Sequence, residues 1–384
     1  MALHLSCSDE YPVFVPISTI NHLDHYQGDV HLINDFHNSF SDVILNMKIA
    51  ILHGPQDLRI EERLLNPDNL QPHQLWVKTE ISAFKIGTDR GNYEGAEQVP
   101  GAPDYPRWVG DSNLGIIQGT GSAVTRFQTG DRVVANMPHQ SEYFINETGP
   151  VVRIPDQVDS EDAVYGFLYA LSALCYRKAH FQIDETVAVV GLGVLGMGAI
   201  ALGCAYGSRV IAIGNSDTRL QWARDIGAYE SLHYNDPELS SKIDQLTENT
   251  GIDLVIQTAN PWPAYQTSVE IVRPGGRVSI VALPGRGELP LDLNPLDMKW
   301  FYNKGISLIA VSGRAGELYP GIQETSVGYP LVDHVLNLMA DHKLEPKRLI
   351  THRMHYTEMS KAYEMALARD KSILGVIFQW NDSD

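Results

Sequence analysis

Three glycines in the middle of the chain have the spacing of a loop that holds a dinucleotide. They are Gly191, Gly193 and Gly196. The apolar run 187–190 precedes them and a helical run, 199–206, follows, so the loop joins a buried strand to a helix. The first glycine permits a tight turn, the second lets the backbone approach a pyrophosphate, and the third lets helix and strand pack closely. The pattern predicts a dinucleotide site that also includes Val194 and Leu195.

The end of the next strand, Arg209–Ile213, indicates which dinucleotide is bound. Enzymes specific for NAD place Asp or Glu here, against the ribose hydroxyls. This chain continues instead with Gly214, Asn215 and Ser216, which carry no negative charge to repel a 2′-phosphate. Arg219 follows, and it could pair with that phosphate or only brace its own helix. The pattern favours NADP(H) over NAD(H).

Composition and charge exclude several other classes of protein. The 384 residues are 43% hydrophobic, which is enough for two domains with cores. A net charge of −18 argues against nucleic acid as a partner, because such binding relies on clustered Lys and Arg. The three cysteines are far apart and indicate neither disulfides nor a cysteine-rich metal site. With no apolar run of membrane-spanning length and no signal-peptide pattern, we expect a cytoplasmic protein without a membrane partner.

The elements around the glycine loop alternate as in an α/β protein with a doubly wound parallel sheet. Four further strands are expected, at 209–213, 253–257, 276–282 and 306–311, with helices between them. Short strands broken by Gly and Pro, between Met47 and about Arg153, predict a small β-barrel-like domain. Two helices, 331–342 and 356–369, and a strand, 375–380, come last, and we expect this C-terminal part to return to the first domain.

These elements predict two domains and an N-terminal extension. Residues 47–163 and 318–384 are assigned to the barrel-like domain, and 164–317 to the dinucleotide-binding domain. A cleft between the two would hold the reactive end of the cofactor. Residues 1–46 have no assigned role, although 12–17 and 30–33 could be added edge strands. The five histidines there are interpreted as surface residues, because no third metal ligand stands at a suitable spacing.

Six ordered segments resemble the medium-chain dehydrogenase/reductase superfamily, across residues 47–380. They are Met47–Pro55, Ile86–Asp89, Gly130–Val134, the glycine loop, Ile226–Ala228 and Arg273–Arg277. The resemblance implies a GroES-like β-barrel catalytic domain, a Rossmann domain, hydride transfer to or from a nicotinamide, and a homodimer or homotetramer. It also implies that Thr258, Ala282, Leu283 and Ser312 line the cofactor. The ending, 346–380, is similar to the branch with threonine-dehydrogenase-like and bacteriochlorophyllide-dehydrogenase-like members.

The chain departs from zinc-dependent members at each ligand position. Those members carry a Cys before Gly-Ser/Thr-Asp, then Gly-His-Glu, then a further Cys, Asp or Glu. Here Ile86 replaces the cysteine, Asp111 and Ser112 replace His-Glu, and 165–171 offers no ligand. The four-cysteine structural lobe of many relatives is also missing after the strand at 133–135. Catalytic zinc needs three protein ligands, so we expect none to be bound.

Without a metal, other side chains must handle the charge that develops on the substrate oxygen. Thr88 matches the hydroxyl that passes a proton to or from substrate in the family, and Asp111 and Ser112 are expected to face the same space. Tyr93, five residues after Thr88, could also reach it. Asp89 is interpreted as a structural carboxylate, and Asp111 could equally be a loop or cap residue. Two more tyrosines, Tyr165 and Tyr169, are held to be packing residues.

We therefore expect a zinc-independent, NADP(H)-dependent oxidoreductase acting on a carbonyl or secondary alcohol of a small or medium metabolite. Two alternatives stay open. The first is reduction of a polarised C=C bond, as in zinc-free quinone and enoyl reductases. The second is a cofactor-binding protein without turnover, which the loss of the zinc ligands would permit.

Overall fold

A computed structural model describes residues 44–95, 104–289, 294–311 and 329–381. All of them belong to one compact unit, 42–384. The two edge strands expected at 12–17 and 30–33, and Ser312, lie outside the described residues. No helix in the described part of the chain is long and apolar enough to cross a bilayer.

The first sheets form from short, alternating strands, as expected for a GroES-like barrel. A three-stranded sheet has the order β2-β1-β4, with β1 and β2 joined as a hairpin in which Leu45 pairs with Leu65 and Leu52 with Leu58. A larger sheet has the order β15-β16-β3-β5-β6-β8, and β7 pairs with β3 outside this path. The bounds are β1 Leu45–Leu52, β2 Leu58–Leu65, β3 Gln74–Phe84, β4 Arg107–Trp108, β5 Asn113–Thr120, β6 Arg132–Ala135, β7 Glu142–Asn146 and β8 Val151–Arg153.

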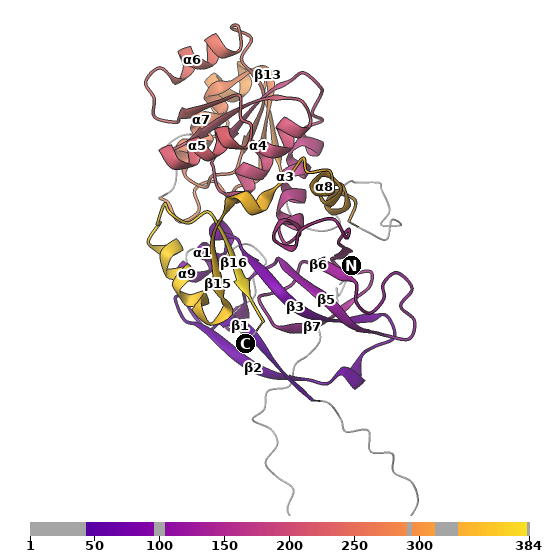
Figure 1. The fold of residues 1–384 in the computed structure, drawn as a ribbon. Helices are drawn as coiled ribbons and strands as arrows, with labels where there is room; N and C mark the ends of the chain where they lie inside the picture. Colours follow the sequence, from indigo (N-terminus) through magenta and orange to yellow (C-terminus); the bar gives the residue numbers. More distant parts are fainter. Residues whose placement is uncertain (1–43, 96–103, 290–293, 312–328, 382–384) are drawn as a thin grey trace, which may run out of the picture. The chain divides into compact units, whose positions relative to one another are not determined.

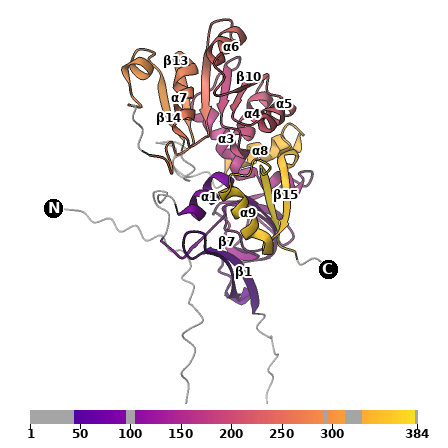
Figure 2. The same cartoon turned by 90° about the vertical axis from the view of Figure 1, so that its left-hand side faces the viewer.

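The C-terminal strands complete this larger sheet, as the sequence predicts. β15 (Ile350–His355) and β16 (Gly375–Gln379) run parallel, and β16 pairs antiparallel with β3, so the last described strand lies beside a strand of the first domain (Figure 1). The expected helix 356–369 is shorter than predicted: a 3₁₀ turn at Tyr356–Glu358 precedes α9 (Met359–Leu367). α9 packs against α1 (Ile86–Glu94), as Figure 2 shows, and their Tyr93 and Tyr363 rings are 5.2 Å apart.

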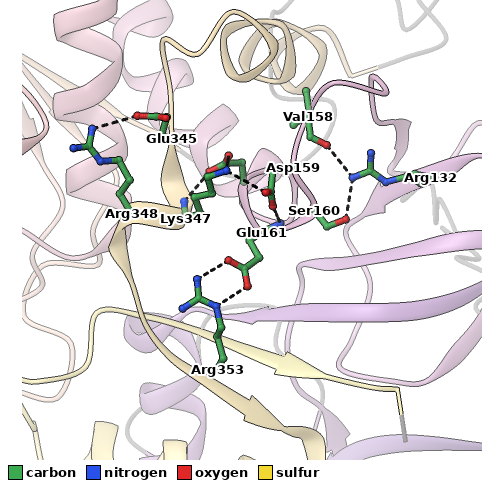
Figure 3. A network of polar contacts seen from close by, with 10 residues as sticks. Arg132, Val158, Asp159, Ser160, Glu161, Glu345, Lys347, Arg348 and Arg353 are labelled. Carbon is green, nitrogen blue, oxygen red and sulfur yellow. Dashed lines mark hydrogen bonds and ion pairs between the residues drawn. The ribbon is translucent and has the colours of Figure 1, made fainter. Parts of the chain in front are cut away.

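A polar network joins the returning segment to the start of α2 (Ser160–Ala163). Lys347 Nζ lies 3.1 Å from Asp159 Oδ2, and Arg353 forms a two-bond pair with Glu161, both bonds 2.6 Å long (Figure 3). On the other side of α2, Arg132 donates to the Val158 carbonyl. These bridges are largely exposed, so each contributes little to stability alone. They connect residues 347–353 to the start of α2.

The second domain is a six-stranded parallel sheet with the order β11-β10-β9-β12-β13-β14. The order reverses between β9 and β12, and ligands of such sheets bind at that point, beyond the carboxyl ends of the strands. The strands are β9 Thr186–Val190, β10 Arg209–Gly214, β11 Glu230–His233, β12 Ile252–Gln257, β13 Val272–Ile280 and β14 Ser307–Ala310. The expected strands are therefore confirmed, and β11 is an additional one.

Helices between these strands and next to them help to cover the sheet. Between the strands are α4 Val194–Ala205, α5 Asp217–Asp225, α6 Leu239–Leu246 and α7 Trp262–Ile271, while α3 Gly166–Lys178 precedes β9 and α8 Pro330–Ala340 follows β14. The side chains of β9 are all buried, in agreement with a strand covered on both faces. One boundary differs from expectation: β13 begins at Val272 and includes the Pro-Gly-Gly turn, where a positive φ of 71° at Gly275 accompanies a shift in its pairing with β12.

Candidate functional site

The glycine loop between β9 and α4 has the geometry that its sequence predicts. Gly191 has a φ of 104°, a conformation that favours glycine. A Cβ atom on Gly196 would lie 1.9 Å from the Gly191 carbonyl oxygen, so only glycine fits there. A Cβ on Gly193 would meet none of the described atoms within 4 Å, which leaves open space at the N-terminus of α4. A pyrophosphate fits this space, because the first N–H groups of α4 point toward it.

Residues after β12 and β13 support the loop and lie at the same edge of the sheet. The Thr258 hydroxyl donates to the Gly191 carbonyl at 2.9 Å. Asn260 Oδ1 accepts the Leu283 N–H at 3.1 Å, and the Ala282 N–H donates to the Gln257 carbonyl at 3.3 Å. The segments that the sequence assigned to the cofactor are thus brought together at the strand ends. Polar groups of these segments form hydrogen bonds with one another. The apolar side chain of Leu283 is exposed.

The ribose end of the site differs from expectation in one residue. Asn215 is exposed at the end of β10, and Ser216 is buried as the residue before α5. Arg219, in contrast, donates from Nη2 to the Ile373 carbonyl at 3.0 Å, which joins α5 to the segment before β16. This is the bracing contact that the sequence left open as the alternative. Arg219 therefore no longer supports a choice between NADP(H) and NAD(H).

An ion pair lies beside the positions that the resemblance assigns to zinc ligands. Lys85 directly precedes Ile86, and its Nζ lies 2.8 Å from Asp111 Oδ1. The Lys85 side chain is 12% exposed and that of Asp111 30%, so the pair is partly shielded and still open to a small ligand. Sequence analysis missed Lys85, because it compared only the ligand positions themselves. Its place next to the substituted cysteine is the signal that would have found it.

The other predicted catalytic residues separate into exposed and interior positions. Thr88 is exposed on the first turn of α1. Ser112 is fully buried and its hydroxyl donates to the Val164 carbonyl, so it is a structural residue here and does not face a substrate. Tyr93 is also buried, against Tyr363, and not in open space. Both side chains point into the core instead, that of Tyr93 from α1 and that of Ser112 from the position directly before β5.

Two buried titratable groups lie beneath the Lys85–Asp111 pair. Asp89 accepts the Lys85 N–H at 2.8 Å, and burial together with the nearby Asp111 charge raises its pKa to about 7. Burial lowers the pKa of His139 to about 4, with opposing influences from Asp111 and Lys85. The Nδ1 atom of His139 is 2.8 Å from Ser82 Oγ, and its Nε2 has no hydrogen-bond partner among the described residues. Sequence analysis missed His139 as well.

The side chains around the Lys85–Asp111 pair do not provide a set of ligands that fits zinc. Ile86 has no donor atom, Ser112 is committed to a backbone carbonyl, and the ammonium of Lys85 would repel a cation beside Asp111. Within the described residues, no group of three His, Cys, Asp or Glu side chains is arranged to hold a metal ion. Tyr165 and Tyr169, from the third ligand region, are fully buried packing residues.

Comparison with known proteins assigns these features to a family. Residues 194–324 match the family model described as "Zinc-binding dehydrogenase". The chain is 25% identical over 307 residues to sorbitol dehydrogenase of Bacillus subtilis, covering 69% of this chain and 86% of that protein. It is 28% identical over 304 residues to NADP-dependent isopropanol dehydrogenase of Thermoanaerobacter brockii, and this match covers 76% of this chain and 79% of that protein.

A solved structure supports the same fold. Galactitol-1-phosphate dehydrogenase from Escherichia coli superposes with a TM-score of 0.73 at 19% identity, and the match covers 87% of this chain and all of the other.

L-threonine 3-dehydrogenase of Anaeromyxobacter sp. (strain K) is also among the sequence relatives. It is 23% identical over 324 residues, and the match covers 76% of this chain and 88% of that protein. These matches support the medium-chain dehydrogenase/reductase superfamily for this chain, and the named relatives indicate an NAD(P)-dependent oxidoreductase.

Proposed function

We propose that this chain interconverts a carbonyl and a secondary alcohol of a small metabolite with NADP(H), and that it does so without zinc. The Lys85–Asp111 ion pair carries the proposal, because it puts a cation where the metal would polarise the substrate oxygen. An alcohol dehydrogenase type of reaction is in line with the sorbitol and isopropanol dehydrogenases among the relatives. The expectation of a homodimer or homotetramer remains part of the proposal.

The bound nicotinamide would supply or accept hydride at the substrate carbon. The protein side chains must then manage the oxygen, which gains negative charge as a carbonyl is reduced. The Lys85 ammonium stabilises that charge, and Asp111 fixes the position of the ammonium. A proton from Lys85, or from the exposed Thr88 hydroxyl, completes the alcohol. In this scheme Asp111 does not itself supply the proton, since it is the anionic partner of the pair.

The preference for NADP(H) rests on the uncharged end of β10. Asn215→Asp adds one carboxylate with almost no change in shape, at an exposed residue. If the 2′-phosphate lies there, the variant should bind NADPH about tenfold or more weakly and bind NADH equally well or better, because like charges repel. Fluorescence titration with both cofactors measures this. Equal affinities in the variant and the wild type would place the 2′-phosphate elsewhere.

The absence of a metal requirement is a second expected result. Purified protein should contain much less than one zinc per chain by elemental analysis, and its turnover should survive dialysis against a chelator. The reason is the donor set, in which Ile86 offers no ligand and Lys85 repels a cation. Stoichiometric zinc, together with activity that a chelator removes and zinc restores, would contradict the proposal.

One experiment separates the proposed reaction from its two alternatives. NADPH consumption is followed with matched panels of ketones, enones and quinones. Turnover of ketones supports the proposal, and turnover confined to enones or quinones would assign C=C reduction instead. Cofactor binding without turnover in any panel would leave a binding protein.

A further inference from the structure

An arginine from the dinucleotide-binding domain packs directly on α1. Arg286 lies in the loop after β13, and its guanidinium occupies the space beside Gly91. A Cβ atom on Gly91 would lie 2.3 Å from Arg286 Cζ and 2.4 Å from Nη2. The missing side chain at Gly91 is therefore what lets the guanidinium approach the helix. This contact joins segments almost 200 residues apart in the sequence.

The Arg286 guanidinium is poorly satisfied in this position. Its Nε and Nη2 atoms are buried, and neither has a hydrogen-bond partner among the described residues. Burial lowers its pKa, and the charges of Arg90 and Arg107 lower it further, whereas Glu94 opposes them. Buried guanidinium groups normally have partners, because an unpaired buried charge is costly.

The neighbouring charges do not balance Arg286. Arg90 is already paired with Glu94, at 3.3 Å between Nε and Oε1. Arg107 is buried against the Tyr105 ring and donates to the Tyr105 hydroxyl at 3.1 Å. Among the described residues, the charges that influence Arg286 are thus those of two arginines, Arg90 and Arg107, and of one carboxylate, Glu94. Such a local excess of positive charge is suited to an anion with planar or tetrahedral oxygens.

The position of this cluster relates it to the proposed site. Gly91 follows Thr88 by three residues in α1, and residues with this spacing lie on the same face, about 5–6 Å apart. Arg286 also follows Leu283, which the sequence assigns to the cofactor, by three residues. An anion held by Arg286 would therefore lie about one helical turn from the Thr88 hydroxyl.

We propose that Arg286 binds the carboxylate or phosphate of an anionic substrate, with Arg90 and Arg107 adding positive charge. This inference rests on the proposed function, because it names the class of carbonyl or alcohol that the site accepts. The same chemistry could be met by a phosphate of the cofactor. The experiment below distinguishes the two sources.

Binding is measured by calorimetry on the full chain saturated with NADP⁺, with inorganic phosphate and malonate as probes. Because the cofactor then occupies its own phosphate positions, a remaining anion site belongs to the substrate. The wild type should bind at least one probe, and Arg286→Met should bind it about tenfold or more weakly, the expected loss for a charge-assisted hydrogen bond. Arg273→Met is the matched control, since it removes an arginine that pairs with Asp253 at 2.7 Å instead. Its probe affinity should match that of the wild type.

Gly91→Ala provides a second variant that keeps every charge. The new Cβ would occupy the place of the guanidinium, so it should displace Arg286 and weaken probe binding severalfold. Alanine also favours a helix more than glycine does, so α1 should not lose stability. Weaker anion binding with an unchanged or higher Tm would identify displacement of Arg286, and not unfolding, as the cause.

Three outcomes would overturn the inference. The first is a cofactor-saturated wild type that binds neither probe. The second is unchanged probe affinity in both Arg286→Met and Gly91→Ala. The third is an Arg286→Met variant that binds NADP⁺ and NAD⁺ tenfold more weakly and keeps its probe affinity, because Arg286 would then serve the cofactor. None of these readouts needs turnover, so a failure of the proposed reaction would be seen separately, in the NADPH assays.

Discussion

Replacing Lys85 by methionine should lower kcat for carbonyl reduction by about 10²–10⁴-fold, the range observed for lost acid–base or oxyanion-stabilising groups. Methionine keeps the length and apolar stem of lysine and removes only the ammonium. Affinity for the cofactor should stay close to that of the wild type, because the glycine loop is formed by other elements. Pre-steady-state and steady-state NADPH oxidation with the best ketone substrate would measure the loss.

The chain offers a matched control in Lys347→Met. Lys347 also pairs with an aspartate, Asp159, at 3.1 Å, but in the network between α2 and β15. This variant should keep its kcat. Asp111→Asn should reduce kcat too, and Asp111→Asn combined with Lys85→Met should be little worse than Lys85→Met alone, since the two act as one unit.

Thr88→Val separates the remaining roles at this site. If Lys85→Met keeps a normal kcat and Thr88→Val loses most of its kcat, Thr88 is the proton donor. This result would contradict the role of the ion pair. Normal turnover in both variants would remove these side chains from the proton step altogether.

Asp89 and His139 should change the pH dependence of the free energy of unfolding in opposite directions. The folded pKa of Asp89, about 7, is above its ordinary 3.8, so folding takes up a proton in this interval and stability falls as pH rises through it. The folded pKa of His139, about 4, is below its ordinary 6.5, so folding releases a proton and stability falls as pH drops from 6.5 toward 4. In the wild type the two effects on stability largely cancel between about pH 4 and 6.5, where both groups change their protonation on folding.

Single substitutions should reveal each effect. Relative to the wild type, Asp89→Asn should make the free energy of unfolding rise more steeply with pH, by up to about 1.4 kcal/mol per pH unit, and His139→Gln should make it fall by a similar slope. Urea unfolding at several pH values between 4.5 and 6.5, on the order of half a unit apart, gives these slopes. Parallel curves for all three proteins would show that neither group changes its protonation on folding.

The sequence predicted the dinucleotide loop because the backbone conformation and close packing of this loop depend on residues near to one another in the chain. The φ of Gly191 and the close approach at Gly196 both follow from residues within the same strand–turn–helix unit. The strands of the parallel sheet were predictable for the same reason, since runs of β-branched and apolar residues identify them. The return of β16 to the first sheet was expected from the order of the last elements, two helices followed by a strand.

The catalytic side depended on contacts between distant segments, which spacing does not reveal. Lys85 meets Asp111 because the end of β3 pairs with the start of β5, and Arg286 meets Gly91 through the packing of two domains. Ser112 was predicted to face the substrate from its place at a ligand position, and Tyr93 from its spacing after Thr88. Tyr93 packs instead against Tyr363, and the buried Ser112 hydroxyl donates to the Val164 carbonyl.

The position of β16 also has a consequence for how the protein is made. This strand lies between β15 and β3, and Trp380, directly after it, donates to Ser82 Oγ at 2.9 Å, beside His139. Synthesis must therefore reach residue 380 before the wall behind the Lys85–Asp111 pair can close. Until then residues 81–84 of β3 lack this strand partner, and an unpaired edge is a template for aggregation during synthesis. A stop codon before β16 would thus remove part of the site's wall together with the strand.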